Sequence, residues 1–470
     1  MRKTKIICTI GPACADEKIL TQMCEAGMNV ARLNFSHGTH EEHKEKIELI
    51  KAVREKLGLP IPIMLDTKGP EYRIKTFAEG SVEVGEGDTF TFTTEDIEGD
   101  ETKVAVSFKR LIEDLAIGDR ILVNNGLVVF EVKELTATEA ICTTIVGGTL
   151  SNRKSMSFPN KVMSGPYLSD QDKADILFGI ENDVDFVAAS FVSTKDDMVA
   201  LRQFLNEHGG NAIDIIAKIE NQAGVDNIDE ICETCEGIMI ARGDLGVEIP
   251  FVQVPAIQKY LTNKCRILGK RVITATEMLE SMIQNPRPTR AEISDVANAV
   301  YDGSSAVMLS GESAAGKYPV ESVRSMAQIC AYTEGHINYK ERFRTSDFQI
   351  KNILDAISHT ACTMTVDVDA KAIVVCSVTG KTARMVSRFR SPVPIIGMTT
   401  DPKVWRKLAL SWGVIPMLAE TFQSTDAMFQ KAKDSAQTAL DLNEGDTIVL
   451  TAGRLNGQSG NTDTLKVAQI

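Results

Sequence analysis

Short apolar runs that alternate with helix-like segments are the feature of this sequence that most restricts its fold. The runs that read as strands lie at residues 5–10, 29–35, 61–65, 184–191, 213–217, 237–241, 271–274 and 305–309. Strands that alternate with helices predict a parallel sheet covered by helices. Eight such units predict an α/β chain built on a (β/α)8 TIM barrel, in which the site lies at the carboxyl ends of the strands.

The alternation of strands and helices breaks after the third strand and changes again near residue 344. Between the third and fourth strands the apolar residues alternate at period two, as in 89–93 and 127–132, which predicts an inserted β domain. Strands expected in the last part lie at 372–376, 393–398, 414–416 and 446–451. We therefore expect a barrel of residues 1–69 and 168–343, a small inserted β-barrel domain at 70–167 and a C-terminal α/β domain at 344–470.

Composition limits the classes of partner. A chain of 470 residues exceeds a single compact core. The formal net charge of −13 argues against nucleic acid as the main partner. No apolar run is long enough to span a bilayer. The apolar stretch that follows the basic start is too short for a signal peptide, so we expect a cytoplasmic protein without a membrane partner. Cys232 and Cys235 form a C-x-x-C without a second pair, and helix spacing is the favoured explanation over a metal or redox site.

Charged residues follow two neighbouring strands near the middle of the chain. Lys218 and Glu220 come after the strand at 213–217, and Asp244 follows the strand at 237–241 in a Gly-Asp-Leu-Gly segment that reads as a turn. Burying two carboxylates and a lysine is costly unless they are paired. A divalent cation with an anionic substrate would pair them. Surface ion pairs on loops are the alternative, but similar clusters recur at other strand ends.

Oxygen donors follow the second and third strands. Asn34, Ser36, Asp66 and Thr67 carry one full charge among them. Hard oxygen ligands of low charge suit a monovalent cation. The same residue types are ordinary in turns and helix caps, and on this set alone the turn interpretation is favoured.

Three further segments need separate interpretations. His37, His40 and His43 stand among charged residues, which favours a solvated helix start, and His37 alone belongs to a strand-end cluster. Residues 311–318 resemble a phosphate loop, but Tyr318 replaces the small hydroxyl residue and a barrel is the wrong context, so we reject that interpretation. Residues 377–382 place hydroxyls, a glycine and a lysine before a helix, which favours a phosphate cradle over a plain tight turn.

Several motifs together carry a resemblance to a known family. They read GMNVARLNFSHG, LDTKGPE, KIEN, ARGDLG, TATEMLESM, PRPTRAE and AVMLSGESA. With these motifs the chain resembles the pyruvate kinases over essentially its whole length. The resemblance implies transfer of a phosphoryl group from phosphoenolpyruvate to ADP, giving pyruvate and ATP in glycolysis. It also implies activation by a sugar phosphate such as fructose 1,6-bisphosphate, and a homotetramer.

The resemblance also implies a role for individual residues. It implies catalytic roles for Arg32, Arg73, Lys218, Thr276 and Ser310. It implies Mg²⁺ or Mn²⁺ on Glu220 and Asp244, K⁺ on Asn34, Ser36, Asp66 and Thr67, and substrate contacts at Arg32, Lys218, Gly243, Asp244 and Thr276. It implies nucleotide contacts at Pro12, His37, Arg73 and Lys154. It implies effector contacts at Ser377, Thr379, Gly380, Lys381 and Thr382, faced by a loop from Thr451 to Thr462.

Three positions depart from the family pattern. Glu277 stands where the family commonly has Gln, Asn124 and Asn125 stand where it has two Asp, and residues 157–161 differ from its usual lid hinge. Glu71 matches the form of the family that needs potassium. Two competing hypotheses are a barrel lyase or aldolase, which would not need the inserted domain, and an inactive sensor of sugar phosphates.

Overall fold

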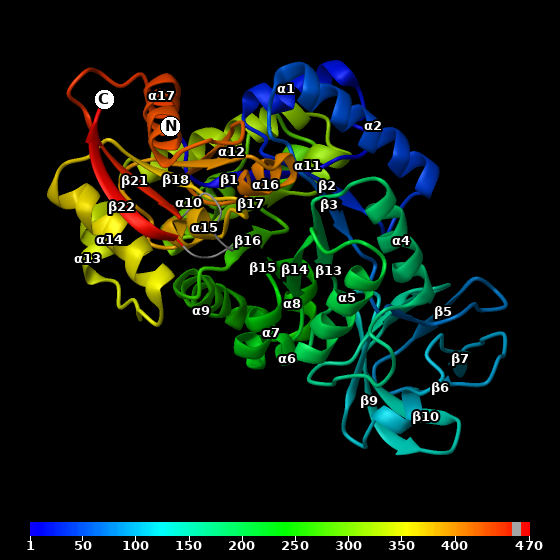
Figure 1. The fold of residues 1–470 in the computed structure, drawn as a ribbon. Helices are drawn as coiled ribbons and strands as arrows, with labels where there is room; N and C mark the ends of the chain where they lie inside the picture. The colour runs from blue at the N-terminus through cyan, green and yellow to red at the C-terminus, as the bar shows by residue number, and fades with distance from the viewer. Residues whose placement is uncertain (454–461) are drawn as a thin grey trace.

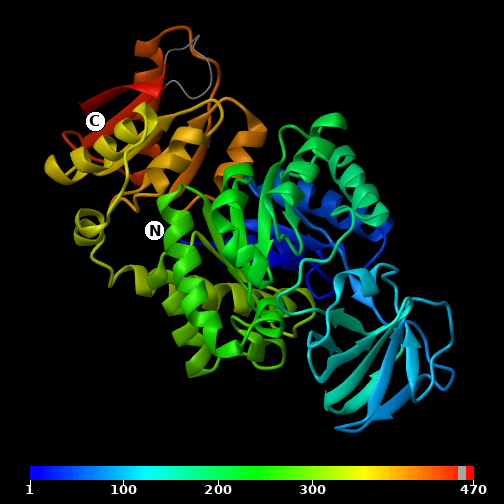
Figure 2. The same cartoon turned by 90° about the horizontal axis from the view of Figure 1, so that it is seen from below.

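The chain folds into a central barrel with a smaller domain on either side of it. The computed structural model describes residues 1–453 and 462–470. The inserted domain and the C-terminal domain project from opposite sides of the barrel (Figures 1 and 2). Within the described residues, no helix combines the length and the apolar character that a membrane span requires.

Eight parallel strands close into the barrel and confirm the predicted fold class. Around the barrel the order is β1-β17-β16-β15-β14-β13-β3-β2. The strands are β1 (Lys5–Thr9), β2 (Val30–Asn34), β3 (Ile63–Asp66), β13 (Phe186–Ala189), β14 (Asp214–Ile219), β15 (Gly237–Ala241), β16 (Arg271–Ala275) and β17 (Ala306–Leu309). Most of their residues are fully buried, because each strand faces side chains inside the barrel and helices outside it.

Helices follow the barrel strands and cover them. They are α1 (Glu17–Ala26), α2 (His40–Leu57), α4 (Asp170–Glu181), α5 (Lys195–Glu207), α6 (Gln222–Asp226), α7 (Ile228–Thr234), α8 (Arg242–Glu248), α9 (Val254–Ile267), α10 (Arg290–Asp302), α11 (Gly311–Ala314) and α12 (Pro319–Glu334), with short 3-10 turns η1 (Phe251–Gln253) and η2 (Glu280–Ile283). Reciprocal capping boxes begin α2, α4, α5 and α10.

The expected turn after β15 is wrong, because this segment forms helix α8. Asp244 lies in the first turn of α8, where a carboxylate is favoured by the helix dipole. Leu245 is fully buried beneath the helix. Burial of this side chain outweighs the local preference of Gly-Asp-Leu-Gly for a turn.

The inserted domain is a curled sheet with its own apolar core. Its strands are β4 (Tyr72–Arg73), β5 (Ser81–Val84), β6 (Thr89–Thr93), β7 (Lys103–Ala105), β8 (Arg120–Val123), β9 (Val128–Leu135), β10 (Glu139–Val146), β11 (Gly148–Ser151) and β12 (Ser155–Ser157), with one short helix, α3 (Leu111–Asp114). The main sheet has the order β4-β12-β8-β9-β10-β6-β7. Its two edges meet through a bridge between Ile74 and Val106, and Phe90, Phe92 and Phe130 fill the interior.

The C-terminal domain has a five-stranded sheet of order β20-β19-β18-β21-β22. Its elements are α13 (Tyr339–Thr345), α14 (Ile353–Asp367), β18 (Ala372–Cys376), α15 (Lys381–Ser387), β19 (Ile395–Thr399), α16 (Pro402–Leu408), β20 (Val414–Leu418), α17 (Thr425–Leu440), β21 (Thr447–Gly453) and β22 (Thr462–Gln469). Strand β22 was not among the expected strands. It is an antiparallel edge strand with mostly polar or part-exposed residues, so it lacks the apolar run that marks the others.

The expected exposure of the histidines is wrong at one position, and the cysteines are buried. His43 is buried and stacks on the Phe35 ring at 3.9 Å, so the expected solvated helix start is wrong at this position. His40 lies 2.7 Å from an oxygen of Asp175. Cys232 and Cys235 are buried free thiols, as are the other cysteines of the chain.

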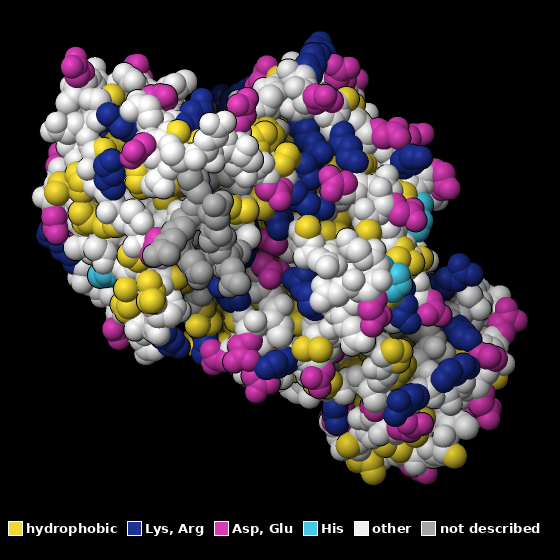
Figure 3. Space-filling view, viewed as in Figure 1, with side chains coloured by type: hydrophobic (Ala, Val, Ile, Leu, Met, Phe, Trp, Pro, Cys, Tyr) yellow, Lys and Arg dark blue, Asp and Glu magenta, His cyan; other side chains and the backbone are white. Residues whose placement is uncertain are grey.

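Ion pairs fasten helix α16 of the C-terminal domain to the amino ends of barrel strands. Arg406 Nε lies 2.8 Å from Asp185 Oδ1, and Arg406 Nη2 lies 2.8 Å from Asp183 Oδ2. Lys407 Nζ lies 2.8 Å from an oxygen of Asp214, the first residue of β14. Figure 3 shows Lys and Arg side chains, with Asp and Glu beside them, gathered over this part of the molecule. The two domains are therefore joined by charge as well as by apolar contact.

Arg406→Met should destabilise the junction of the two domains. The substitution leaves the fully buried Asp185 carboxylate without its closest cation. Breaking such a buried pair costs about 3 kcal/mol of unfolding free energy, which urea unfolding would measure. Lys403→Met is the matched control, because its partner Asp183 is 51% exposed and the loss should stay below about 1 kcal/mol. Equal effects of the two substitutions would contradict this account.

Candidate functional site

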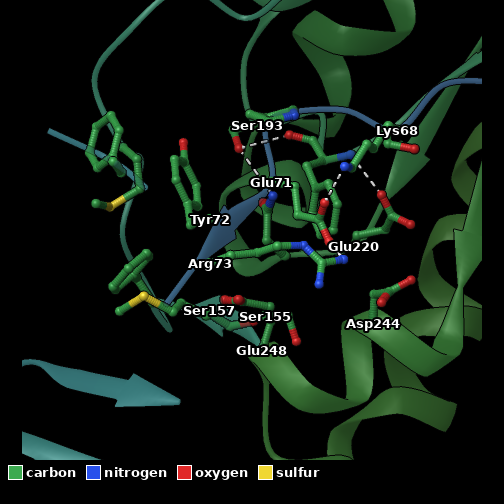
Figure 4. A pocket seen from close by; sticks show the side chains of 18 of the residues that line it. Lys68, Glu71, Tyr72, Arg73, Ser155, Ser157, Ser193, Glu220, Asp244 and Glu248 are labelled. Atoms are coloured by element: carbon green, nitrogen blue, oxygen red, sulfur yellow. Dashed lines mark hydrogen bonds and ion pairs between the residues drawn. The ribbon is translucent and has the colours of Figure 1, made fainter. Parts of the chain in front are cut away.

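A cavity of about 720 Å³ lies at the carboxyl ends of the barrel strands, between the barrel and the inserted domain. Its polar lining includes Arg32, Asn34, Ser36, His37, Lys68, Glu71, Arg73, Lys154, Lys218, Glu220, Asp244 and Glu248. Figure 4 shows side chains of the inserted domain reaching toward Glu220 and Asp244 from across the cavity. The structure therefore brings residues of both domains to one chamber.

Lys218 is the central cation of the barrel wall of this cavity. Its Nζ lies 2.9 Å from Glu220 Oε1 and 3.1 Å from Asp66 Oδ1, and it donates a hydrogen bond of 2.7 Å to Ser190 Oγ. Burial alone would lower the pKa of Lys218, but the Asp66 and Glu220 carboxylates raise it above its ordinary value. The ammonium group therefore stays protonated although its side chain is only 10% exposed.

Arg32 and Asp66 extend this charge set along the neighbouring strands. Arg32 Nε lies 2.6 Å from Asp66 Oδ2, and Arg32 Nη1 donates to Thr9 Oγ1 at 2.8 Å. Asp66 is fully buried and sits beside Asn34 in the register of β2 and β3. One carboxylate thus positions two cations, Arg32 and Lys218, at the floor of the cavity.

Glu220 and Asp244 form a pair of carboxylates that fits a cation. Glu220 Oε2 accepts a hydrogen bond of 2.6 Å from the Phe191 backbone, whose positive φ of 55° turns the amide toward it. Glu220 Oε1 has the ion pair with Lys218 but accepts no hydrogen bond from the described residues. Burial raises the pKa of Glu220 to about 7, and the nearby Asp244 carboxylate, which is exposed at the cavity, also raises it. A divalent cation between them would offset that repulsion.

The described residues contain no group of three or more His, Cys, Asp or Glu side chains arranged to hold a metal ion. A cation at Glu220 and Asp244 would therefore take its remaining ligands from substrate and water. Such partial coordination is common for Mg²⁺, which keeps several waters and is bound through one or two carboxylates.

The four expected potassium ligands lie near one another but face different ways. Asn34 and Ser36 line the cavity, and Asn34 Oδ1 accepts a hydrogen bond of 3.1 Å from the Ser36 backbone. Asp66 and Thr67 are buried behind the cavity wall. Thr67 Oγ1 accepts a hydrogen bond from the Ser190 backbone at 3.1 Å. The assignment of these residues to potassium stays a prediction.

Thr276 lies next to Gly243 but outside the lining of the cavity. The Gly243 amide donates to Thr276 Oγ1 at 2.8 Å, and that hydroxyl donates to the Ala275 carbonyl at 2.6 Å. Arg242 Nη2 holds the Thr276 carbonyl at 2.6 Å, which helps to keep Thr276 at a φ of 70°. Ser310 and Pro12 likewise do not line the cavity.

The inserted domain contributes its own ion pairs to the cavity. Glu71 bridges Lys68, at 2.8 Å, and Arg73, whose Nη2 contacts Glu71 Oε1. Burial would raise the pKa of Glu71, but the hydrogen bonds from Arg73 and Lys68 lower it. In Figure 4 the Arg73 guanidinium extends toward the carboxylates of Glu220 and Asp244. Asn124 and Asn125 also line the cavity, both at positive φ.

Ser190 and Glu248 are site residues that the sequence reasoning missed. Ser190 accepts a hydrogen bond from Lys218. The sequence signal that pointed to it is its position at the end of a predicted barrel strand. Glu248 lies one helical turn beyond Asp244 on α8 and lines the cavity. Hydrogen bonds from the Ser157 hydroxyl and the Phe158 backbone reach its carboxyl group from the inserted domain. Glu248 thus connects the helix that carries Asp244 to the inserted domain.

Part of the predicted phosphate cradle of the C-terminal domain lines a smaller cavity, separate from the cavity at the barrel mouth. Thr379, Gly380 and Lys381 line this cavity of about 250 Å³ together with Arg384 and Lys407. The other two predicted residues lie elsewhere: the Ser377 amide donates to Met398, and Thr382 Oγ1 lies 2.6 Å from Thr462 Oγ1. Within the facing loop, positions 454–461 lie outside the described residues.

Comparisons with known proteins give one consistent family. A family described as "Pyruvate kinase, barrel domain" matches residues 1–323, and one described as "Pyruvate kinase, alpha/beta domain" matches residues 355–468. A pyruvate kinase of Clostridium acetobutylicum is 48% identical over 472 residues, covering 100% of both chains. One of Geobacillus stearothermophilus is 47% identical and covers 100% of this chain and 80% of its own. A crystal structure of a pyruvate kinase from Cryptosporidium parvum has a TM-score of 0.95 at 37% identity, covering 100% of this chain and 96% of that one.

Stability should depend on pH through Glu248. Burial raises the pKa of this carboxyl group from 4.5 to about 7, so the folded chain favours the protonated form. As pH rises from 4.5 through 7, Glu248 ionises more readily in the unfolded chain than in the folded chain. The free energy of unfolding therefore falls over this range. Glu248→Gln cannot ionise, so its Tm relative to the wild type should rise between pH 5 and pH 8. A Tm difference that stays constant, as we expect for the exposed control Glu55→Gln, would contradict the prediction.

Proposed function

The chain belongs to the pyruvate kinase family, and from this we propose that it transfers the phosphoryl group of phosphoenolpyruvate to ADP, giving pyruvate and ATP. One observation carries the proposal. A protonated lysine, Lys218, lies between two buried carboxylates at the edge of a chamber that a second, basic wall closes. Such a chamber suits a substrate with several negative charges.

We assign Glu220 and Asp244 to a divalent cation, Mg²⁺ or Mn²⁺. The mutual repulsion of the two carboxylates, which a bound cation would offset, supports this assignment. When bound, the cation would supply positive charge for the carboxylate and phosphoryl oxygens of the substrate. The Asp244 amide at the start of α8 would orient the substrate carboxylate, joined by the Gly243 amide and the Thr276 hydroxyl once the substrate replaces their hydrogen bonds to Thr276 and Ala275.

Lys218 and Arg32 stabilise charge that moves during phosphoryl transfer. As the bond between the enolate oxygen and phosphorus breaks, negative charge grows on that oxygen and on the transferring group. The Lys218 ammonium is held in place by Ser190, Asp66 and Glu220, so it needs no rearrangement to interact with this charge. Arg32, fixed by Asp66 and Thr9, contacts the same phosphoryl group.

A proton must reach the enolate carbon to complete pyruvate. We assign its delivery to the Thr276 hydroxyl, with water and Ser310 behind it. In the structure the only proton of this hydroxyl is donated to the Ala275 carbonyl, and its oxygen accepts from the Gly243 amide. To protonate the enolate carbon, the hydroxyl would turn that proton toward the substrate and take a replacement from the water and Ser310 behind it.

The inserted domain acts as a lid that carries nucleotide contacts. Arg73 and Lys154 line its side of the cavity, and His37 lines the barrel side. Together with Pro12, which follows the first barrel strand, they would contact the nucleotide, with Arg73 on the phosphates of ADP. Closing the lid excludes water, so that the phosphoryl group passes to ADP and is not hydrolysed.

Further parts of the proposal concern ions, effectors and assembly. Asn34, Ser36, Asp66 and Thr67 would hold K⁺, near Glu71. Residues 377–382 would bind a sugar phosphate, supported by the lysine and glycine that line the smaller cavity. We also propose a cytoplasmic homotetramer, on the basis of family membership.

Lys218→Met should lower kcat by about 100-fold or more, because the preorganised positive charge at the reacting group is lost. Pyruvate formation, coupled to lactate dehydrogenase and followed at 340 nm (about the NADH absorbance maximum), measures the effect. Lys173→Met on the exposed side of α4 is the control and should keep the wild-type rate. Wild-type turnover in Lys218→Met, with folding checked by circular dichroism, would remove lysine from the mechanism.

Replacing potassium by sodium at equal ionic strength should lower pyruvate formation severalfold. The smaller Na⁺ has a different preferred coordination, so it would not order Asn34 and Ser36 in the same way. The assay uses saturating magnesium in both salts. Equal rates in potassium and sodium would contradict the assignment of the oxygen donors to a monovalent cation.

Lys381→Glu should abolish activation by fructose 1,6-bisphosphate, because a carboxylate at the start of α15 repels a phosphate group. The readout is the change that the sugar phosphate causes in the KM for phosphoenolpyruvate. An unchanged response in the variant would show that residues 377–382 are not the effector site.

A further inference from the structure

Four arginines come together where the barrel adjoins the C-terminal domain. They are Arg266 at the end of α9, Arg342 in α13, and Arg388 and Arg390 directly after α15. In Figure 1, α9, α13 and α15 lie on the same side of the molecule, at this junction. Arg266, Arg388 and Arg390 are 5%, 5% and 3% exposed, and Arg342 is part-exposed. We call these residues the arginine cluster.

The side chains of Arg266, Arg342 and Arg390 converge on the turn after α10. Arg390 Nη2 donates to the Gly303 carbonyl at 2.7 Å, and Arg342 Nη2 donates to the neighbouring Asp302 carbonyl at 3.0 Å. A Cβ placed on Gly303 would lie 2.9 Å from Arg342 Nη2 and 3.5 Å from Arg266 Cδ. Three guanidinium side chains thus surround one glycine. Arg388 Nη1 donates to the Ile267 carbonyl at 3.1 Å, directly beside Arg266.

Many donors of the cluster lack an acceptor. Among the described residues, no hydrogen-bond partner reaches Arg266 Nε, Arg266 Nη1, Arg388 Nε or Arg390 Nε. In the same part of the chain, Asp355 is the carboxylate that forms an ion pair with the cluster, 3.1 Å from Arg388 Nη2. The Asp302 carboxylate is engaged by Lys259 and by Gln258. Asp355 thus pairs with Arg388, and among the described residues Arg266, Arg342 and Arg390 have no ion-paired carboxylate.

Such an arrangement is unfavourable as it stands. Arg266 Nη2 donates to Asn263 Oδ1 and Arg390 donates to Ser387, Gly303 and Ser305, but the remaining buried donors lose their hydration without a hydrogen bond in return. Burial and the neighbouring Arg342 lower the pKa of Arg266 to about 10. Burial, together with Arg266 and Arg342, lowers the pKa of Arg390 well below its ordinary value. An anion placed among these groups would supply the missing acceptors and reduce their mutual repulsion.

We propose that the arginine cluster binds a phosphate group, either inorganic phosphate or the phosphate of a small monoester. The planar guanidinium fork matches the oxygens of phosphate, and a phosphate dianion offsets more positive charge than a carboxylate does. Arg342 is the part-exposed member, so the ligand enters on its side. The site is separate from the catalytic cavity and from residues 377–382, whose lining residues do not include the cluster. The bound phosphate stabilises the contact between the barrel and the C-terminal domain.

Equilibrium dialysis of the full chain with ³²P-labelled inorganic phosphate tests the proposal. The variants are Arg266→Met and, because it is part-exposed and less prone to misfold, Arg342→Met. Arg324→Met is the matched control, an exposed arginine of α12 whose nearest carboxylate oxygen, from Glu321, lies 3.9 Å away. Lys381→Met identifies phosphate bound at residues 377–382. Competition with glycerol 1-phosphate then shows whether the free ion or a monoester binds more tightly.

The proposal expects each cluster variant to bind one phosphate fewer per chain than the wild type and than Arg324→Met. It also predicts that the Tm difference between Arg266→Met and the wild type depends on the anion in the buffer. In chloride buffer Arg266→Met should melt at or above the wild-type Tm, because like charges are removed. In phosphate the wild type should gain about 2 °C that the variant does not. Unchanged stoichiometry in both cluster variants would overturn the proposal. So would an altered oligomeric state in Arg342→Met without any phosphate bound, which would indicate that a second copy of the chain fills the cluster.

Discussion

The ion pairs of Lys218 with Asp66 and Glu220 are the interaction on which the candidate site depends. A lysine this deeply buried keeps its proton only because a carboxylate from β3 and one from the end of β14 lie within about 3 Å of its Nζ. Those two strands are separated by β13, whose Ser190 completes the set of contacts. Closure of the barrel therefore brings these charged side chains together. Their ion pairs depend on the register in which β3, β13 and β14 align.

The two appended domains act on the two ends of the same strands. At the carboxyl ends, Arg73 and Glu248 connect the cavity with the inserted domain. At the amino ends, α16 of the C-terminal domain forms ion pairs with Asp185, just before β13, and with Asp214, at the start of β14. The arginine cluster lies at this same domain junction. A ligand that alters the position of the C-terminal domain would thus act on strands that carry Ser190 and Lys218.

The sequence allowed more of the barrel to be predicted than of its surroundings. Apolar runs followed by charged residues located Lys218, Glu220 and Asp66 at strand ends, and barrel closure makes such residues neighbours. Helix α8 was missed because turn-forming residues mask the buried Leu245, and β22 was missed because an edge strand needs few apolar residues. Glu248 and the arginine cluster could not be predicted, since contacts between separate domains leave no periodic pattern in the chain.

The measurement that tests the central claim most directly is Mn²⁺ binding followed by electron paramagnetic resonance, in the full chain without substrates. The account places one divalent ion on Glu220 and Asp244, so Glu220→Gln and Asp244→Asn should each weaken binding by at least about tenfold. Glu55→Gln, which changes an exposed carboxylate of α2 outside the cavity lining, is the control and should bind as the wild type does. Wild-type affinity in both site variants would contradict the metal site and the charge arrangement built around it.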